Sequence, residues 1–287
     1  MNRLDKAYEK ILQLYEAEGL SPGCLEGITF SGKWTSVFGG LGQNGMAFNF
    51  TGEHSVYGAI DPAPLVELQC FVGKPLINLA EYLSQKEDIL HRSVYLAVLN
   101  ALSAPLNRRE RLITRGFSFV NKEQFEFVKE DDFVTVIGAG GVIGNLQKRC
   151  KEVHVLDMRN KNTLENLYVG KEICRGPGRL KFHNPEESAA LLSQSDIVFM
   201  TGCTLVNQTI FDLLPMIKKA RVIGVFGPSA MILADFLSDL GVNYIQTVCI
   251  TDSEAMKEWM LNGFGMKIPE IMMENYLIKI CKEGEIS

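Results

Sequence analysis

The sequence lacks long apolar runs and clustered basic residues, and each absence excludes a class of protein. No stretch reaches the ~18 apolar residues that a membrane span needs, and residues 1–6 have no apolar core of a signal peptide. The net charge is −5, and the one basic run, at 108–111, is short and interrupted by a glutamate. A nucleic-acid surface would need clustered Lys and Arg. We therefore expect a protein that binds neither membranes nor nucleic acid.

The sequence also lacks the spacings of a preformed metal site. Its seven cysteines include no C-x-x-C pair, and its four histidines include no H-x-x-x-H pair. Scattered cysteines are typical of free thiols in a reducing compartment, so we expect a cytoplasmic protein. His154 lies inside an apolar run and is interpreted as a core histidine whose ring is hydrogen-bonded within the fold.

The length and the pattern of apolar residues indicate two domains. A chain of 287 residues with 46% hydrophobic residues can form two modest cores. Residues 1–120 are expected to form an α+β domain. In it, helical spacing occurs at 3–18, 76–85 and 89–103, and the glycine-rich stretch 25–50 favours short antiparallel strands.

Residues 121–287 alternate between strands and helices. Continuous apolar runs, which are typical of strands buried on both faces, lie at 133–137, 153–156, 197–200 and 222–226, with a weaker strand at 179–182. Helical stretches lie between them, at 141–148, 186–194, 208–217 and 230–240, and closing helices are expected at 254–261 and 270–282. The pattern predicts an α/β fold, a Rossmann-like doubly wound parallel sheet preceded by the smaller α+β domain. The charged segment 107–130 is interpreted as the connection between domains.

A glycine-rich turn follows the first strand of this sheet. The turn Gly138-Ala139-Gly140-Gly141-Val142-Ile143-Gly144 stands at the phosphate-binding position of a Rossmann fold, although Ile143 occupies the place of the third glycine of G-x-G-x-x-G. Asp157 ends the next strand and is a candidate acceptor for ribose hydroxyls. The pair favours a nucleoside-containing ligand, such as NAD(P) or S-adenosylmethionine. The alternative is that the glycines serve only helix packing and that Asp157 caps a loop.

Two polar loops follow later strands, and open α/β sheets bind ligands at such carboxyl ends. The residues that we expect to converge on one polar ligand are Thr201, Gly202, Thr204, Asn207, Gly227 and Ser229. Asn207 and Ser229 are also sensible N-cap residues. Cys203 is a candidate soft metal ligand or nucleophile if a helix N-terminus lowers its pKa, and is otherwise a small apolar filler.

These loops carry a family resemblance. The string Thr201-Gly202-Cys203-Thr204-Leu205-Val206-Asn207 with Thr209, then Gly227-Pro228-Ser229, Gly241-Val242 and Thr251-Asp252, resembles the signature of the putative heavy-metal chelation family. Segments 31–35 and 100–102 are similar to the companion N-terminal domain of that family, which has an enolase N-terminal-like fold. The resemblance implies one cleft between two domains. It also implies a role in making or handling metal-chelating molecules such as pterins, flavins or siderophores, by condensation or hydrolysis.

Three classes of function stay open at this point. The first is an enzyme that processes a chelating molecule in the cleft, with Asp157, Asn207 and Asp252 as polar catalytic candidates and with Trp34 stacking on a flat ring such as a pterin. The alternative for Trp34 is a purely structural role, as an anchor in the core or at an interface. The second class is a protein that holds a metal or a metal chelate without turning it over. The third is a nucleotide-cofactor-dependent enzyme. The cofactor, the metal and the formation of a homo-oligomer are not decided by the sequence.

Overall fold

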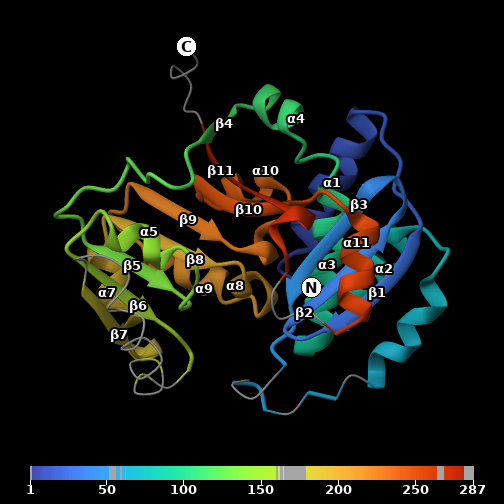
Figure 1. Cartoon of the computed structure of the whole chain (residues 1–287), viewed down its shortest axis with the longest axis horizontal. Helices are drawn as coiled ribbons and strands as arrows, with labels where there is room; N and C mark the ends of the chain where they lie inside the picture. The colour runs from blue at the N-terminus through green and yellow to red at the C-terminus, as the bar shows by residue number, and fades with distance from the viewer. Residues whose placement is uncertain are drawn as a thin grey trace.

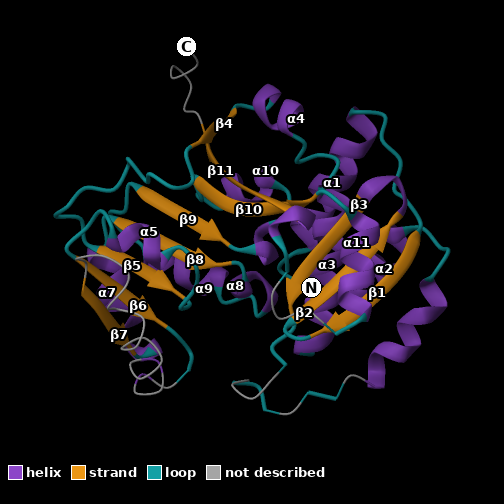
Figure 2. Cartoon of the chain, viewed as in Figure 1, coloured by secondary structure: helices purple, strands orange, loops and turns teal. Residues whose placement is uncertain are grey.

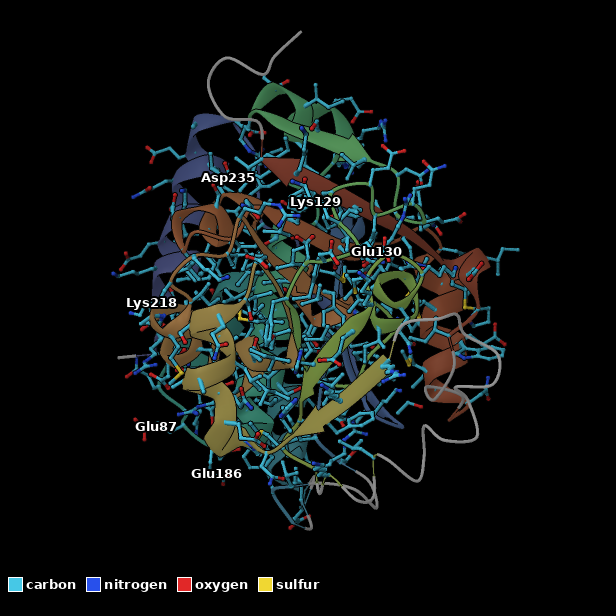
Figure 3. The ribbon with its side chains drawn as sticks, turned by 90° about the vertical axis from the view of Figure 1, so that its left-hand side faces the viewer. Glu87, Lys129, Glu130, Glu186, Lys218 and Asp235 are labelled. Carbon is cyan, nitrogen blue, oxygen red and sulfur yellow. The ribbon has the colours of Figure 1, made fainter. Side chains whose placement is uncertain are left out.

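The computed structural model describes residues 2–51, 56–58, 60, 61, 63–159, 161, 164, 179–263 and 268–280. They form two sheets, one of three antiparallel strands and one of eight strands (Figure 1). Helices cover both sheets, as the colouring by secondary structure makes plain (Figure 2). Charged side chains such as Glu87, Glu186 and Lys218 are exposed at the rim of the molecule (Figure 3).

The small sheet confirms the antiparallel strands expected in the glycine-rich stretch. Its order is β1 (Leu25–Ser31), β2 (Trp34–Gly39) and β3 (Gln43–Phe48). The long helix α3 (Ile89–Ser103) packs on β3 and β2, and α11 (Ser253–Leu261) packs on β1 and β2. In Figure 1, α11 lies in front of this sheet and α3 behind it. The sheet is therefore held between a helix of the first half and a helix of the second half of the chain.

Close approach of β3 to α3 depends on one glycine. A Cβ atom at Gly45 would lie 2.2 Å from the carbonyl oxygen of Ala97 and 2.3 Å from the amide nitrogen of Ala101. Any side chain there would push the strand off the helix. The helices α1 (Asp5–Ala17) and α2 (Leu76–Ser84) complete this part, with α2 packed on α3, and all three helices agree with the helical spacing of the sequence.

The large sheet has the strand order of a doubly wound fold. Its order is β4-β11-β10-β9-β8-β5-β6-β7, and the run from β7 to β10 is parallel, with the order 3-2-1-4-5-6 in chain sequence. Its parallel strands are β5 (Val134–Ile137), β6 (Glu152–Leu156), β7 (Arg179–His183), β8 (Ile197–Thr201), β9 (Val222–Phe226) and β10 (Tyr244–Ile250). The connecting helices are α5 (Ile143–Gln147), α7 (Ser188–Gln194), α8 (Cys203–Val206), α9 (Ile210–Leu213) and α10 (Ala234–Asp239). The predicted α/β class is confirmed.

Two predictions about this part are wrong. Residues 273–280, expected in a closing helix, form strand β11 (Met273–Ile280), which is antiparallel to β10 and also pairs with β4. Residues 107–130, expected to be a plain connection, contain α4 (Arg109–Thr114) and β4 (Phe117–Val120). Both strands have one cause. β4 and β11 are far apart in sequence but form backbone hydrogen bonds with each other, and the periodicity of a local segment cannot reveal such a partner.

One apolar cluster extends across both sheets. It contains Leu96 of α3 together with Val198 of β8 and Leu237 of α10. The arrowheads of β8 and β9 point toward the small sheet in Figure 1, so the carboxyl edge of the large sheet faces β2 and β3. Within the described ranges, none of the helices has both the length and the apolar content that crossing a membrane requires.

Candidate functional site

The candidate site lies where the strand order of the large sheet reverses, between β5 and β8. At this point the loops after two neighbouring parallel strands diverge, which opens the crevice that α/β proteins use for ligands. Gly138 follows β5 and Thr201 ends β8. A Cβ atom at Gly138 would lie 2.5 Å from Thr201 Cγ2, and the φ of Gly138 is +87°. The glycine turn and the first polar loop therefore meet, as the sequence predicts.

The other glycines of the turn differ in what surrounds them. A Cβ atom at Gly140 would lie 2.4 Å from Phe226 Cε2, so this glycine is needed for packing against a buried ring. Gly141 and Gly144 have open space around the Cβ position. Helix α5 begins only at Ile143 and is five residues long, so it offers a short dipole to an anion. Packing accounts for Gly138 and Gly140, and anion binding by this turn stays a prediction.

Asp157 holds the glycine turn in place. Its Oδ2 accepts hydrogen bonds from the Ala139 amide at 2.8 Å and from Arg159 Nη2 at 2.7 Å. Its Oδ1 accepts from the Arg159 amide and from Arg159 Nε, both at 2.9 Å. Burial alone would raise the pKa of Asp157, but the bonds and charge of Arg159 and the Ala139 amide outweigh it and hold the pKa below its usual value. A carboxylate offers about four lone-pair sites, and four donors of the chain already bond to this one. The role of Asp157 as a ribose acceptor stays a prediction.

The loop after β8 packs directly on the loop after β9. A Cβ atom at Gly202 would lie 2.7 Å from the Ala230 amide nitrogen and 2.8 Å from the Ser229 carbonyl carbon. Thr204 Oγ1 donates a hydrogen bond to the Thr201 carbonyl at 2.7 Å. Gly227 has a φ of +98° and open space at its Cβ position. The structure thus brings the residues of the two loops together, although Thr204 and Ser229 are buried and their hydroxyls serve the protein itself.

Ser229 joins the two sheets. Its Oγ accepts a hydrogen bond from the Phe48 amide at the end of β3, at 2.9 Å. Asn100 of α3 reinforces the junction, because its Nδ2 donates to the Met46 carbonyl at 2.7 Å and to the Ser229 carbonyl at 3.3 Å. The Oδ1 of Asn100 is buried and has no hydrogen-bond partner among the described residues. A loop of the large sheet, a strand of the small sheet and α3 therefore meet at one point.

The hairpin of β1 and β2 brings Lys33 and Trp34 to this junction. Trp34 pairs with Phe48 across the sheet, and their rings pack edge to face with centroids 5.8 Å apart. Phe48 contacts Phe50, whose backbone has a φ of +57°, a costly conformation for a non-glycine residue. Lys33 Nζ lies 5.9 Å from the centre of the Trp34 ring. Trp34 is half-buried and also packs against an apolar cluster with Met256, so an anchoring role accounts for part of its surface.

Cys203 lies at this junction as a protonated thiol. Burial raises the pKa of Cys203 to about 11; the hydrogen bond to Thr201 and the charge of Lys33 oppose the rise, and the charge of Asp157 adds to it. Of the two alternatives for Cys203, the raised pKa favours the apolar filler over the activated thiol, because α8 is a four-residue helix whose weak dipole does not offset burial. Nor do three or more His, Cys, Asp or Glu side chains gather as a metal site in the described part of the chain.

Asn207 and Asp252 lie at the same edge of the sheet and have local partners. Asn207 Oδ1 accepts from Thr209 Oγ1 at 2.8 Å, and its Nδ2 lies 3.6 Å from the sulfur of Met158, a half-exposed residue next to Asp157. Asp252 follows β10 and caps α11 by accepting from the Ala255 amide at 3.0 Å. Asp252 is thus the N-cap of α11, a role that was not expected from the sequence. The N-cap roles expected for Asn207 and Ser229 are not found, because Thr209 precedes α9 and Gly227 precedes the 3-10 helix that contains Ser229, although Asn207 Oδ1 accepts from the Thr209 amide at 3.2 Å. Catalytic roles for Asp157, Asn207 and Asp252 stay predictions.

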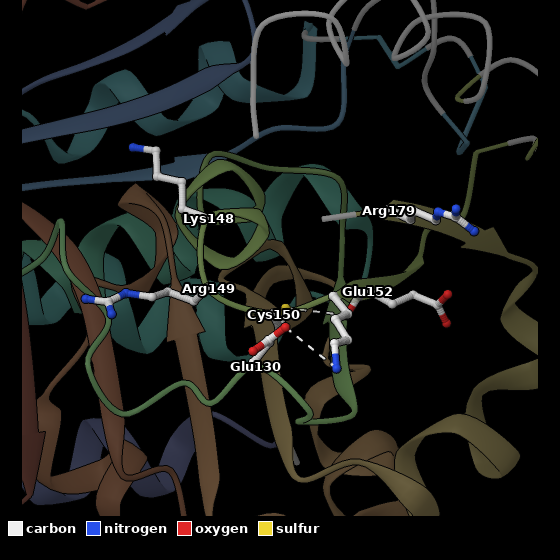
Figure 4. Close-up of a pocket in the computed structure, with 7 residues that line it drawn as sticks. Glu130, Lys148, Arg149, Cys150, Glu152 and Arg179 are labelled. Atoms are coloured by element: carbon white, nitrogen blue, oxygen red, sulfur yellow. Dashed lines mark hydrogen bonds and ion pairs between the residues drawn. The ribbon is translucent and has the colours of Figure 1, made fainter. Parts of the chain in front are cut away.

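An open hollow of about 640 Å³ lies at the opposite edge of the large sheet, beside the first residues of β6 and β7. Its charged side chains point in different directions: Lys148, Arg149 and Arg179 diverge, while Glu130 is paired with Lys151 at 3.6 Å (Figure 4). Diverging and paired charges do not make a cradle for one ligand. The carboxyl edge, where loops of both sheets converge, is the stronger candidate.

Comparison with known proteins assigns the family. Two models described as "putative heavy-metal chelation" match the chain, one over residues 15–103 and the other over residues 123–279. The second match covers more than half of the chain. The chain belongs to this family. The match includes every polar loop of the large-sheet edge described above, from the glycine turn to Asp252.

Relatives agree on the fold. A protein of unknown function from Pyrococcus horikoshii has a TM-score of 0.66 at 20% identity, covering 96% of this chain and 99% of that one. Another, from Desulfitobacterium hafniense, has a TM-score of 0.66 at 18% identity, covering 95% and 99%. An uncharacterized protein of Methanocaldococcus jannaschii is 26% identical over 179 residues, so the chain spans 61% of that relative's length.

Sequence reasoning missed several residues of the junction. Arg159 donates hydrogen bonds to the Asp157 carboxylate and stands only two positions after it. A basic residue just after a strand that ends in Asp is a signal for such an ion pair. Asn100 is a lone amide in an otherwise apolar helix, which is a signal for a buried hydrogen-bonding role. Lys33 carries no such signal, because only the fold brings the hairpin to Cys203.

Proposed function

We propose that this protein binds a small metal-chelating molecule at the carboxyl edge of its large sheet, with the β1–β2 hairpin closing the site. Residues 1–120 and 121–287 would act as two domains around one cleft, and the enolase N-terminal-like description applies to the first. The observation that carries the proposal is the hydrogen bond from the Phe48 amide to Ser229 Oγ, at 2.9 Å. It supports a ligand site shared by both sheets, because it ties the loop after β9 to the strand that pairs with Trp34.

The charges at the junction favour an anionic ligand. Asp157 is neutralised by Arg159, whose Nη2 lies 2.7 Å from its Oδ2. The charge of the half-buried Lys33 reaches the Cys203 thiol and lowers its pKa against the effect of burial. Chelators carry carboxylate, enolate or phenolate oxygens, and such groups are stabilised by a cation in a partly dry site. A flat ring in the ligand would suit the face of Trp34.

Binding without turnover is supported better than catalysis. The Cys203 thiol is protonated at neutral pH, and the lone pairs of Asp157 are occupied by Arg159 and Ala139. Neither group is poised as a nucleophile or a general base. A condensation or hydrolysis, the finer activity implied by the family resemblance, would need ligand binding to release one of these groups. The nucleotide-cofactor alternative is weaker, because a ribose would find no free acceptor on Asp157.

Native mass spectrometry tests this proposal. The chain, purified under mild conditions, is expected to carry a small anionic molecule as a mass adduct. Lys33→Met should lose most of the adduct, and Lys33→Arg should keep it, because the charge is the contribution that matters. A folded Lys33→Met protein that retains the full adduct would contradict the proposal, as would a wild-type protein that carries none and binds no chelator from a panel of catecholates, pterins and hydroxy acids.

A further inference from the structure

A continuous chain of hydrogen-bonding side chains crosses β6 and β7, away from the carboxyl-edge site. Glu152 and His154 alternate along β6, and Lys181 and His183 alternate along β7. The parallel register pairs His154 with Lys181 and Leu156 with His183, so these side chains share one face of the sheet. Glu187 follows one helical turn after His183, in the 3-10 helix η3 (Pro185–Glu187).

Three short contacts join two carboxylates through two imidazoles. Glu152 Oε1 lies 2.9 Å from His154 Nε2, and Glu187 Oε2 lies 2.9 Å from His183 Nδ1. Between them, His154 Nδ1 and His183 Nε2 face each other at 3.0 Å. Every imidazole nitrogen of the pair is therefore engaged, the outer two by carboxylates and the inner two by each other.

The carboxylates decide where the protons lie. A carboxylate only accepts hydrogen bonds, so at 2.9 Å each outer nitrogen donates an N–H to its carboxylate. Two neutral imidazoles have then used both of their protons. The inner nitrogens are left with two lone pairs facing each other at 3.0 Å, which is stable only with a cation between them.

We propose that His154 Nδ1 and His183 Nε2 bind a divalent transition-metal ion such as Zn²⁺. Two neutral imidazole nitrogens are ordinary ligands for this class of ion. Without the metal, a shared proton fills the same place, and the metal displaces that proton to solvent as it binds. Water completes the coordination. The site shares no residue with the carboxyl-edge site, so either proposal can fail without the other.

The geometry fits a metal with little movement. Zn–N bonds of about 2.0–2.1 Å in a tetrahedral site hold two nitrogens about 3.3 Å apart, a few tenths of an ångström beyond the 3.0 Å of this structure. Metal-bound histidines usually donate their other N–H to a carboxylate, which fixes the tautomer and raises ligand basicity. Glu152 and Glu187 stand in those positions. The Phe133 ring stacks on His154 with centroids 4.2 Å apart and fixes its plane.

Charge and access also suit a cation. Glu152 and Glu187 contribute two negative charges to the pair; Lys181 Nζ lies 2.7 Å from Glu152, and the charge of Lys161 acts on Glu187. The His183 side chain is 16% exposed, and Glu152 lines the open hollow at the amino edge of the strands.

Calorimetric titration of Zn²⁺ into the whole, metal-stripped chain without a histidine tag tests the proposal. One equivalent should bind, and repeating the titration in buffers of different ionisation enthalpy should show about one proton released per zinc. His154→Gln and His183→Gln should each weaken binding by at least about tenfold, and Glu187→Gln, which keeps both imidazoles, by about tenfold. The matched control is His91→Gln, because His91 also lies between two carboxylates, Asp88 and Glu67, but has no imidazole partner in these contacts.

Two results would overturn the proposal. The first is the absence of stoichiometric zinc binding at neutral pH, which would leave a proton as the only occupant of the pair. The second is equal zinc affinity in wild type, His183→Gln and Glu187→Gln. Glu187 is exposed, so Glu187→Gln is expected to fold. Its zinc affinity therefore tests the proposal even if a histidine variant does not fold.

Discussion

At the scale of single residues, Cys203 shows how burial overrides a polar neighbourhood. The hydrogen bond to Thr201 and the charge of Lys33 both act to lower the pKa of the thiol, yet burial raises it to about 11. Only the thiolate reacts with alkylating agents. Iodoacetamide at pH 8 should therefore label the exposed Cys24 and Cys70 well before Cys203. The Cys203 rate should rise about tenfold per pH unit while the pH stays below the pKa. Peptide mass spectrometry after timed quenching measures the order, and labelling of Cys203 first would contradict this account.

Gly140 and Gly141 are neighbours with different roles. A Cβ at Gly140 would lie 2.4 Å from the buried Phe226 ring, whereas a Cβ at Gly141 meets nothing within 4 Å. Gly140→Ala should lower the free energy of unfolding by about 1–3 kcal/mol, because the ring must move. Gly141→Ala should change it by less than about 0.5 kcal/mol. Urea unfolding of both variants measures these changes. Equal losses of unfolding free energy in the two variants would refute the packing role of Gly140.

At the scale of elements, one ion pair fastens the turn after β5 to the end of β6. Arg159 and the Ala139 amide hold the folded pKa of Asp157 below its usual value of about 3.9, against the effect of burial. A depressed carboxyl pKa stabilises the fold above the unfolded pKa, and the contribution is lost as pH falls through the folded pKa.

Asp157→Asn tests this coupling. At pH 7 the variant should lose about 1–3 kcal/mol of unfolding free energy, since the carboxylate accepts charged and backbone donors in a buried place. The difference from wild type should shrink between pH 4 and the lowest pH at which both proteins fold. The control is Asp131→Asn, which removes a fully solvated ion pair with Lys151 and should change little. A loss that is independent of pH would show that the charge of Asp157 is not the cause.

Sequence periodicity predicted the elements whose partners are nearby in the chain. The apolar runs of β5, β8 and β9 are each followed by a helix, the run of β6 forms its strand, and the helical spacing of α1, α2 and α3 appears in the structure as expected. It missed β4 and β10, and it failed for β11, because Tyr276-Leu277-Ile278 fits a helix or a strand equally well until β4 and β10 are placed on either side. The converging loops were predictable because neighbouring parallel strands end at the same edge of a sheet. The approach of Lys33 to Cys203 and the contact between His154 and His183 were not, because each joins segments that are far apart in the sequence.

At the scale of the whole molecule, the two sheets share a core. Leu96 and Leu99 of α3 belong to the same buried cluster as Val198, Leu205 and Leu237 of the second half. Separating the halves would expose this surface, so they should unfold together. Differential scanning calorimetry of the intact chain is expected to show one transition with equal calorimetric and van't Hoff enthalpies. Two resolved transitions would mean that the halves are independent and that the site between them is not built on a common core.

The central claim is that both sheets bind one ligand, and a double-mutant cycle tests it most directly. The affinity of the co-purified molecule is measured for Trp34→Ala, Asn207→Ala and the double variant, with Trp259→Ala in α11 as the control tryptophan. The account predicts at least about tenfold weaker binding in each single variant, an interaction term of about 0.5 kcal/mol or more in the double, and normal binding in the control. Normal binding by a folded Trp34→Ala protein would contradict the claim and leave the large sheet as a self-contained binding module.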